Sequence, residues 1–212
     1  MIHLAISVEG GTEERLVKEI LKPHLAHYHV DVVSIVNLKG GVSFGRAAAD
    51  IERLLNNPHH QYVTTLYDFY GFSGRQEADS AASLEGRFSA NFRNSEKLLP
   101  YIQQYEIEAL LLSSPKILAH YFDLPTKTMR EIDAVVQQAR GAENVNDSVL
   151  NKPSGRLERW TKGGPALKRY QSKAKAFHFV PILEQIGLPT IRAQCPRFNT
   201  WLTTLETLAE RS

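Results

Sequence analysis

Five acidic side chains stand at or near the ends of apolar segments between residues 9 and 108. They are Glu9, Glu13, Asp68, Glu106 and Glu108. Oxygen ligands in this number, without a cluster of histidine or cysteine, favour Mg²⁺ or Mn²⁺ over zinc. One or two such ions can activate a water and stabilise the leaving oxygen of a phosphodiester. These residues therefore predict a divalent-metal site with phosphodiester chemistry.

Each of these acids also has an ordinary structural explanation. Glu9 can be a solvated residue at a strand end, Glu13 the partner of a helix dipole, and Asp68 a turn residue. Glu106 and Glu108 can be surface acids. In an extended segment these two side chains share one face, whereas on a helix they diverge by about 200°. The sequence leaves both arrangements open.

The segments that precede Glu9 and Asp68 are typical of parallel strands. Residues 2–8, 30–36 and 62–67 are apolar or β-branched, and helical patterns separate them. Strand–helix–strand order with short loops gives right-handed crossovers and a parallel sheet. Glu9 and Asp68 then lie at the carboxyl edge of that sheet, where open α/β sheets bind ligands.

The helix after the first strand and the fourth apolar segment carry further signals. Thr12 is expected to cap the first helix, and Pro23 to kink it or end it near Lys22. In residues 98–105, Pro100 lacks the N–H of a ladder bond. This segment is therefore predicted as an edge strand or as one that starts later.

Charge is distributed unevenly along the chain. Residues 150–175 hold eight lysines and arginines and one glutamate, a net charge of +7, so the rest carries −5 of the overall +2. A basic segment on an acidic body suits a site that binds metal and phosphate. Arg156, Lys173 and Lys175 are the candidates to hold a nucleic-acid phosphate. A solvated loop with surplus lysines is the alternative.

The remaining reactive residue types give weaker signals. The eight histidines show no strong ligand spacing, and the glycine pairs match neither a P-loop nor a dinucleotide fingerprint. The single cysteine, Cys195, is typical of a small buried hydrophobe and fits a reducing cytosol, so a cytoplasmic location is expected. No apolar run approaches the roughly 18–20 residues that span a bilayer, so no membrane partner is expected.

Several short motifs together resemble a known family. They are VEGGTE (8–13), TTLYDFYG (64–71), QYEIEALL (104–111), PSGRL (153–157) and CPRFNTWL (195–202). Along nearly its whole length the chain is similar to the Toprim fold of topoisomerases, primases and OLD-type nucleases. More closely, it resembles a bacterial family of Toprim-like proteins of unknown function, akin to RloB-type proteins. These are often encoded beside AAA or ABC-type ATPases in restriction and phage-defence loci.

The resemblance implies an α/β fold, with a Toprim-like parallel sheet flanked by helices and a mostly helical C-terminal extension. It implies a catalytic core in residues 1–113. The helical and basic region 114–212 would pack on that core as one compact unit.

The resemblance also implies a Mg²⁺- or Mn²⁺-dependent site with one or two ions. Glu9 would be the general acid/base or a metal ligand, Asp68 a metal ligand, and Glu106 and Glu108 members of the acidic cluster. The sequence departs from the Toprim pattern at Tyr70, which stands in place of a second aspartate.

The leading hypothesis is a divalent-metal-dependent endonuclease on DNA or RNA in a phage-defence or restriction context. Lys173 or Lys175 with Arg156 would neutralise the phosphate, and an ATPase partner is implied. The rival hypothesis is a catalytically silent Toprim-like subunit that docks on an ATPase. A third hypothesis is a nucleotidyl- or phosphoryl-transferase, but the sequence has no nucleotide-binding motif. Assembly into a homo-oligomer stays open.

Overall fold

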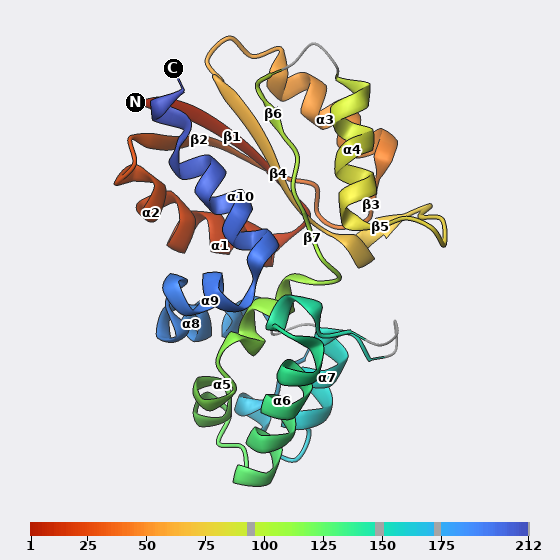
Figure 1. The fold of residues 1–212 in the computed structure, drawn as a ribbon, viewed down its shortest axis with the longest axis vertical. Helices are drawn as coiled ribbons and strands as arrows, with labels where there is room; N and C mark the ends of the chain where they lie inside the picture. The colour runs from red at the N-terminus through yellow and green to blue at the C-terminus, as the bar shows by residue number, and fades with distance from the viewer. Residues whose placement is uncertain (93–95, 147–150, 172–174, 212) are drawn as a thin grey trace. The chain divides into compact units, whose positions relative to one another are not determined.

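The computed structural model describes residues 1–92, 96–146, 151–171 and 175–211, and the chain forms two compact units. Unit 1 comprises Met1–Gln104 and Thr200–Ser212, and unit 2 comprises Tyr105–Asn199. The fold is α/β, with a parallel sheet flanked by helices, as the sequence predicts (Figure 1). The division after Gln104 falls before the expected boundary at residue 113, and the end of the last long helix belongs to unit 1.

The sheet of unit 1 consists of parallel strands. The strands are β1 (Ile2–Val8), β2 (Val30–Asn37), β4 (Tyr62–Asp68), β6 (Leu98–Leu99) and β7 (Ile102–Gln103). They pair in the order β2-β1-β4-β6, and β7 pairs with β4 further along the strand. The central strands β1 and β4 are buried along almost their whole length. Burial on both faces explains why their sequences are continuous apolar runs and not alternating patterns.

The fourth apolar segment lies at the edge of the sheet, as Pro100 predicts, and it is divided into β6 and β7 at Pro100 and Tyr101. Thr65 of β4 bridges this gap with its side chain. Its Oγ1 accepts a hydrogen bond from the Tyr101 N–H at 2.9 Å and donates to Tyr101 O at 2.8 Å. A threonine side chain thus replaces the ladder bonds that the interrupted strand lacks.

One helical segment follows β1, and Pro23 shapes it. α1 (Gly11–Leu16) runs into the π-helical segment η1 (Val17–Leu21) and then into α2 (Lys22–Ala26). Because Pro23 has no N–H and its ring crowds the preceding turn, the wider π turn accommodates it. The segment therefore continues past Lys22.

The start of α1 corrects one prediction. The N-cap is Gly10, and Thr12 lies inside the helix with 5% of its surface exposed. The first helical bond runs from the Glu14 N–H to Gly10 O at 3.1 Å, so the helix starts directly at the glycine turn. Glu13 takes part in the cap, because its Oε2 accepts from the Gly10 N–H at 2.9 Å.

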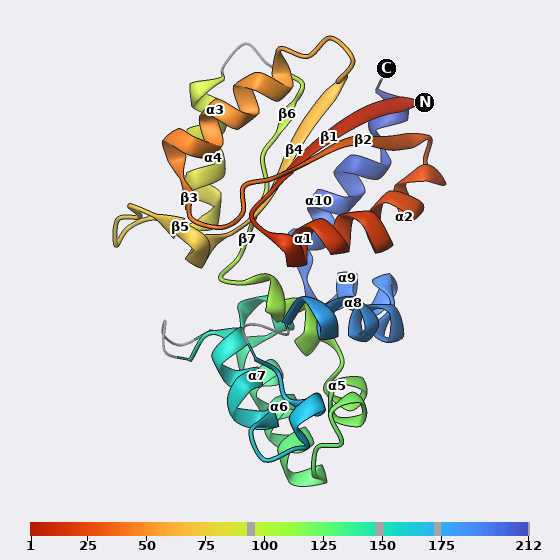
Figure 2. The same ribbon diagram turned by 180° about the vertical axis from the view of Figure 1, so that it is seen from behind.

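Helices cover both faces of the sheet. α3 (Phe44–Leu55) and α4 (Ala81–Asn91) lie on one face, and α1, α2 and α10 (Pro196–Glu206) lie on the other (Figures 1 and 2). Trp201 anchors α10, because its ring stacks on Tyr101 and its Nε1 donates to Thr64 Oγ1 at 2.9 Å. Beside the main sheet, β3 (Val42–Ser43) pairs with β5 (Phe72–Ser73).

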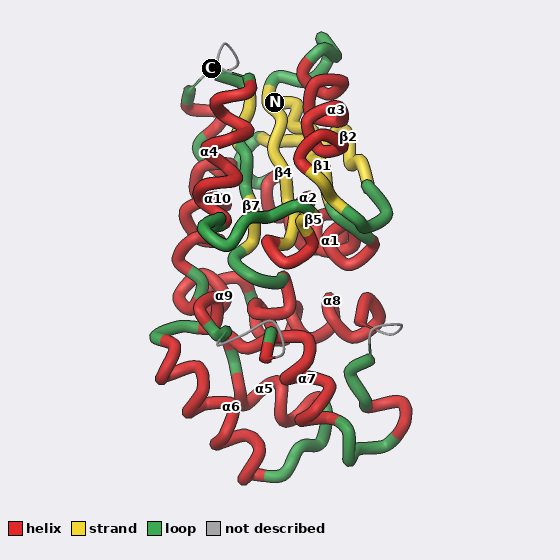
Figure 3. The backbone as a smooth tube through the Cα atoms, turned by 90° about the vertical axis from the view of Figure 1, so that its right-hand side faces the viewer, coloured by secondary structure: helices red, strands yellow, loops and turns green. Residues whose placement is uncertain are grey.

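The described part of unit 2 is helical, and the strands drawn in yellow in Figure 3 all belong to unit 1. Its elements are η3 (Ile107–Ser113), α5 (Pro115–Tyr121), α6 (Thr126–Ala139), η4 (Ala142–Asn144), α7 (Pro153–Thr161), η6 (Ala166–Lys168), α8 (Lys175–Ile186) and α9 (Leu188–Gln194). The 3₁₀ helix η3 is buried at every residue, and α5, α7, α8 and α9 all contact it. No helix in the described parts of the chain has the length and apolar character that crossing a membrane requires.

Cys195 behaves as the sequence predicts. It is fully buried and lies 3.5 Å from the Ser113 hydroxyl. Burial raises the pKa of the Cys195 thiol to about 12. The thiolate that nucleophilic chemistry needs is therefore scarce at neutral pH.

Candidate functional site

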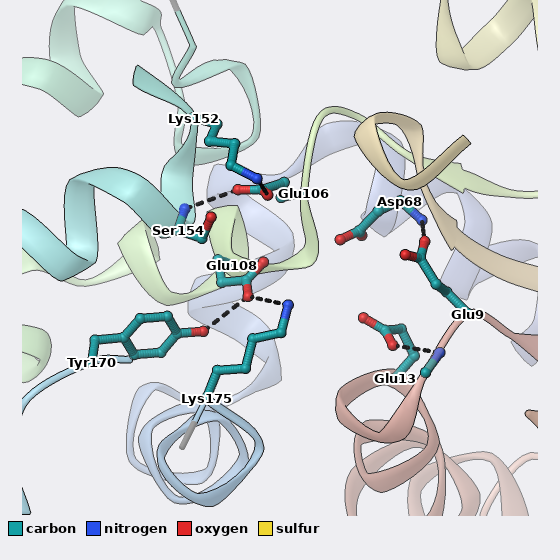
Figure 4. Close-up of polar contacts among 10 residues, drawn as sticks. Glu9, Glu13, Asp68, Glu106, Glu108, Lys152, Ser154, Tyr170 and Lys175 are labelled. Carbon is teal, nitrogen blue, oxygen red and sulfur yellow. Dashed lines mark hydrogen bonds and ion pairs between the residues drawn. The ribbon is translucent and has the colours of Figure 1, made fainter. Parts of the chain in front are cut away.

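Glu9 and Asp68 come together at the carboxyl edge of the sheet in unit 1. β1 pairs with β4 with Val8 opposite Leu66, so Glu9, directly after β1, lies near Asp68, the last residue of β4. Glu9 Oε2 accepts a hydrogen bond from the Asp68 N–H at 3.0 Å (Figure 4). Asp68 is 6% exposed. The parallel strands thus place both acids at one edge, as expected.

Gly71 fixes the position of the Glu9 carboxylate, and sequence reasoning did not identify it. A Cβ atom at Gly71 would lie 2.1 Å from Glu9 Oε2 and 2.3 Å from Oε1. Atoms this close overlap, so only glycine fits beside the carboxylate. The available signal was a glycine three residues after the strand-end acid, in TTLYDFYG.

Glu13 contributes a third carboxylate to this edge of unit 1 (Figure 4). It is 3% exposed, and its hydrogen bond to Gly10 holds it at the positive end of α1. Within the described residues, however, no three His, Cys, Asp or Glu side chains are grouped so that they could hold a metal ion. An ion bound here would therefore have at most two of these carboxylates as ligands unless a side chain turns.

A buried polar network lies beneath the same strands. The Tyr67 hydroxyl donates to Ser7 Oγ at 2.7 Å, and the Ser7 hydroxyl donates to Asp50 Oδ2 at 2.6 Å. Arg53 pairs with the other Asp50 oxygen at 2.7 Å. Burial raises the pKa of Tyr67 far above its usual value, so its hydroxyl stays a donor. The network ties α3 to the two strands that carry Glu9 and Asp68.

Glu106 in unit 2 holds the start of a helix. Its Oε2 accepts from the Ser154 N–H at 2.9 Å, in the first turn of α7, and its Oε1 pairs with Lys152 Nζ at 2.7 Å (Figure 4). A carboxylate is favoured at this position by the helix dipole. The charge of Glu106 is therefore compensated by groups of its own unit.

Glu108 is the most deeply buried acid of the predicted cluster. Its side chain has no exposed surface, and Oε1 accepts from Lys175 Nζ and from the Tyr170 hydroxyl, both at 3.0 Å (Figure 4). Within the described residues, Oε2 has no hydrogen-bond partner. A buried carboxylate is tolerated only when its charge is paired, and Lys175 supplies that charge.

The predicted phosphate-binding residues have different positions. The Lys175 side chain is 35% exposed while it pairs with Glu108. Arg156 Nε donates to Asn151 O at 2.8 Å, which holds the chain just before α7. Lys173 lies outside the described residues. Lys152 and Tyr170, which compensate the two glutamates, carried no spacing signal in the sequence.

Comparison with known proteins gives one match. The family model described as Domain of unknown function (DUF4276) matches residues 8–206. No curated protein and no solved structure matches the chain.

Proposed function

The chain belongs to the family described as Domain of unknown function (DUF4276), and from the acidic edge of unit 1 we propose that it is a divalent-metal-dependent phosphodiesterase. More specifically, the protein would be an endonuclease that cleaves DNA or RNA. Its sheet would be of the Toprim type. The observation that carries the proposal is the pair Glu9 and Asp68 on adjacent parallel strands. Ligand sites of open α/β sheets lie at such strand ends.

The donor set suits a hard cation. Glu9 and Asp68 would hold the ion, and Mg²⁺ needs only one or two carboxylates when phosphate and water complete its shell. When bound, such an ion supplies positive charge to a phosphate oxygen and makes water more acidic. Two carboxylates are thus enough for the proposed chemistry, although no larger group of ligands lies together in the described residues.

The protein side chains supply position and charge. The Asp68 amide and the close packing of Gly71 hold the Glu9 carboxylate in one orientation, which suits a general acid/base or a ligand. In unit 2 we propose that Arg156 and Lys175, with Lys173, contact nucleic-acid phosphates. A lysine ammonium has three donors, so its bond to Glu108 does not exclude a phosphate contact.

Metal-ligand roles for Glu106 and Glu108 stay predictions. Each already has a lysine partner, at 2.7 Å and 3.0 Å respectively. An ion at either carboxylate would compete with that ammonium group. The unpartnered Oε2 of Glu108 makes it the better candidate of the two.

A silent Toprim-like subunit of an ATPase complex is the second candidate function. Tyr70 in place of an acid after Asp68, and the lack of a group of three or more ligands in the described residues, favour it. In this role Glu9 and Asp68 would hold the structure of the sheet edge and would not catalyse a reaction. Under both proposals the protein acts in phage defence together with an ATPase of AAA or ABC type.

Calorimetry with Mn²⁺ and Mg²⁺ tests the metal site, with plasmid nicking and RNA cleavage measured in the same buffers. The key variant is Glu9→Gln with Asp68→Asn, which removes two charges but keeps side-chain size. Glu52→Gln is the control, because Glu52 is an exposed acid on α3. We expect the double variant to lose metal binding and cleavage together, and the control to keep both.

Other outcomes separate the two functions. Metal binding without cleavage of either nucleic acid would favour the silent subunit or a requirement for the ATPase. If the wild type binds no Mn²⁺ at millimolar concentration, the metal-dependent mechanism is wrong. Metal binding that survives in the double variant would move the site away from Glu9 and Asp68.

A further inference from the structure

Unit 2 contains a cavity of about 630 Å³ that the proposed phosphodiesterase chemistry does not use. Its walls come from the start of α5, one face of α6, and the segment that joins α9 to α10. The size falls within the range of about 300–1,000 Å³ that is typical of small-molecule sites. None of the acids discussed above lines it.

The cavity carries an excess of positive charge. Lys116, Arg130 and Arg140 line it, against a single acid, Asp133. In the described parts of the chain, none of these three cations forms a side-chain hydrogen bond or ion pair. Asp133 accepts a hydrogen bond from Gln137 at 2.8 Å and does not neutralise them. Three uncompensated cations around one cavity favour a ligand with several negative charges.

Helix geometry explains how two of these cations reach the same cavity. Arg130, Asp133, Gln137 and Arg140 follow one another at intervals of three or four residues along α6 and its end. Side chains with this spacing share one helix face. Lys116 joins them from the first turn of α5.

The rim near Arg140 is held firmly. Arg140 has a left-handed backbone conformation, with φ of 58°, at a helix end where glycine is the usual residue. A Cβ at Gly141, the next residue, would lie 2.9 Å from Gln194 O, so the ends of α6 and α9 are in close contact. This contact fixes the end of α6 beside the end of α9 on this side of the cavity.

The floor of the cavity is apolar. Val136 of α6 is 6% exposed, and Met129 and Pro115 also line the space. An apolar floor beside a cationic rim suits a ligand with a flat ring at one end and phosphates at the other. A polyanion without a ring would use only part of this surface.

We propose that this cavity binds a nucleoside polyphosphate. Its phosphates contact Lys116, Arg130 and Arg140, and its base packs on Val136 and Met129. A concave pocket of small-molecule size lined by three elements favours such a ligand over a nucleic-acid strand, which needs a groove that follows several nucleotides. The inference is independent of the metal site in unit 1.

Calorimetry on the full chain tests the proposal, with ATP, GTP and inorganic triphosphate as probes. The variant is Arg130→Gln with Arg140→Gly. Glycine adopts a φ of 58° readily, so the second change removes the guanidinium without straining the backbone. Lys127→Gln is the control, because Lys127 is an exposed cation of the same helix outside the cavity lining.

We expect the double variant to bind ATP at least about tenfold more weakly than the wild type, because two charge-assisted contacts are lost. The control should differ by less than about twofold. Equal weakening in the control would overturn the proposal, as would no binding of any probe at millimolar concentration. Binding of a single-stranded oligonucleotide but not ATP, lost in the double variant, would replace the small-molecule site with a nucleic-acid site.

Discussion

The substitution Gly71→Ala tests the geometry of the strand edge. The new methyl carbon would lie 2.1, 2.3 and 2.4 Å from Oε2, Oε1 and Cδ of Glu9. The carboxylate must move away, and its hydrogen bond from the Asp68 N–H breaks. Leaving that amide without its acceptor costs about 1–3 kcal/mol, and crowding adds a similar amount. Since Glu9 is half-buried and water can replace part of the bond, we expect a loss of about 2–3 kcal/mol in the free energy of unfolding.

Chemical denaturation of the wild type and the variant measures this loss. Gly86→Ala is the matched control, because Gly86 lies inside α4 and nothing lies within 4 Å of a Cβ placed there. Alanine is the better helix former, so the control should gain about 0.5–1 kcal/mol. The same substitution is thus expected to act with opposite signs at the two positions.

A double-mutant cycle separates the Glu9 contact from a general intolerance of alanine. In a Glu9→Ala background the clash at Gly71 disappears, so Gly71→Ala should cost at least about 1 kcal/mol less than in the wild type. If Gly71→Ala leaves stability unchanged, or if its cost is the same in both backgrounds, the Glu9 carboxylate does not occupy the position described.

Two further predictions concern buried polar groups. Asp50→Ala removes the acceptor of the Ser7 hydroxyl and the partner of Arg53. Chemical denaturation should show a loss of about 1–3 kcal/mol in the free energy of unfolding, and Asp50→Asn should lose less. Equal losses in the two variants would mean that the acceptor oxygen is unimportant. Burial lowers the pKa of His178 from 6.5, so the unfolded chain binds this proton more tightly than the folded chain. The free energy of unfolding should therefore fall as the pH drops below about 6.5, by no more than about 1.4 kcal/mol per pH unit. His178→Gln should flatten that slope, and a slope unchanged in the variant would contradict the assignment.

The sheet could be predicted from sequence because its signals are local. The runs that became β1 and β4 are buried on both faces, so they show almost uninterrupted apolar residues, and the edge strand β2 is marked by its β-branched residues. Pro100 likewise predicted an edge strand, because a residue without an N–H cannot donate a ladder bond, and β6 lies at the end of the strand order. The parallel direction of the strands then followed from connection rules.

Features that depend on a choice among nearby residues were harder to predict. Thr12 has good capping chemistry, yet the helix starts earlier because Gly10 takes the extended turn and Glu13 completes the cap. α7 lies in the basic segment, where lysines and arginines obscure a short apolar face formed by Leu157 and Thr161. In both cases several nearby residues offered similar local signals, and the sequence pattern did not distinguish between them.

The partners of the acidic residues could not be predicted at all, because they come from distant parts of the sequence. Lys152 is 46 residues from Glu106, and Lys175 is 67 residues from Glu108. No local pattern links such pairs. The sequence therefore predicted these glutamates as members of one acidic cluster with Glu9 and Asp68, without their lysine partners.

The lysine pairs change how the acids should be ranked. A carboxylate that already faces an ammonium offers less negative potential to a cation, because the ion must repel or displace that charge. Glu106 and Glu108 each carry such a partner, Lys152 at 2.7 Å and Lys175 at 3.0 Å. Metal binding is tested most directly at Glu9 and Asp68, because the paired strands bring these two acids together at one edge of the sheet. The paired glutamates are better understood as anchors that hold α7 and Lys175 in position.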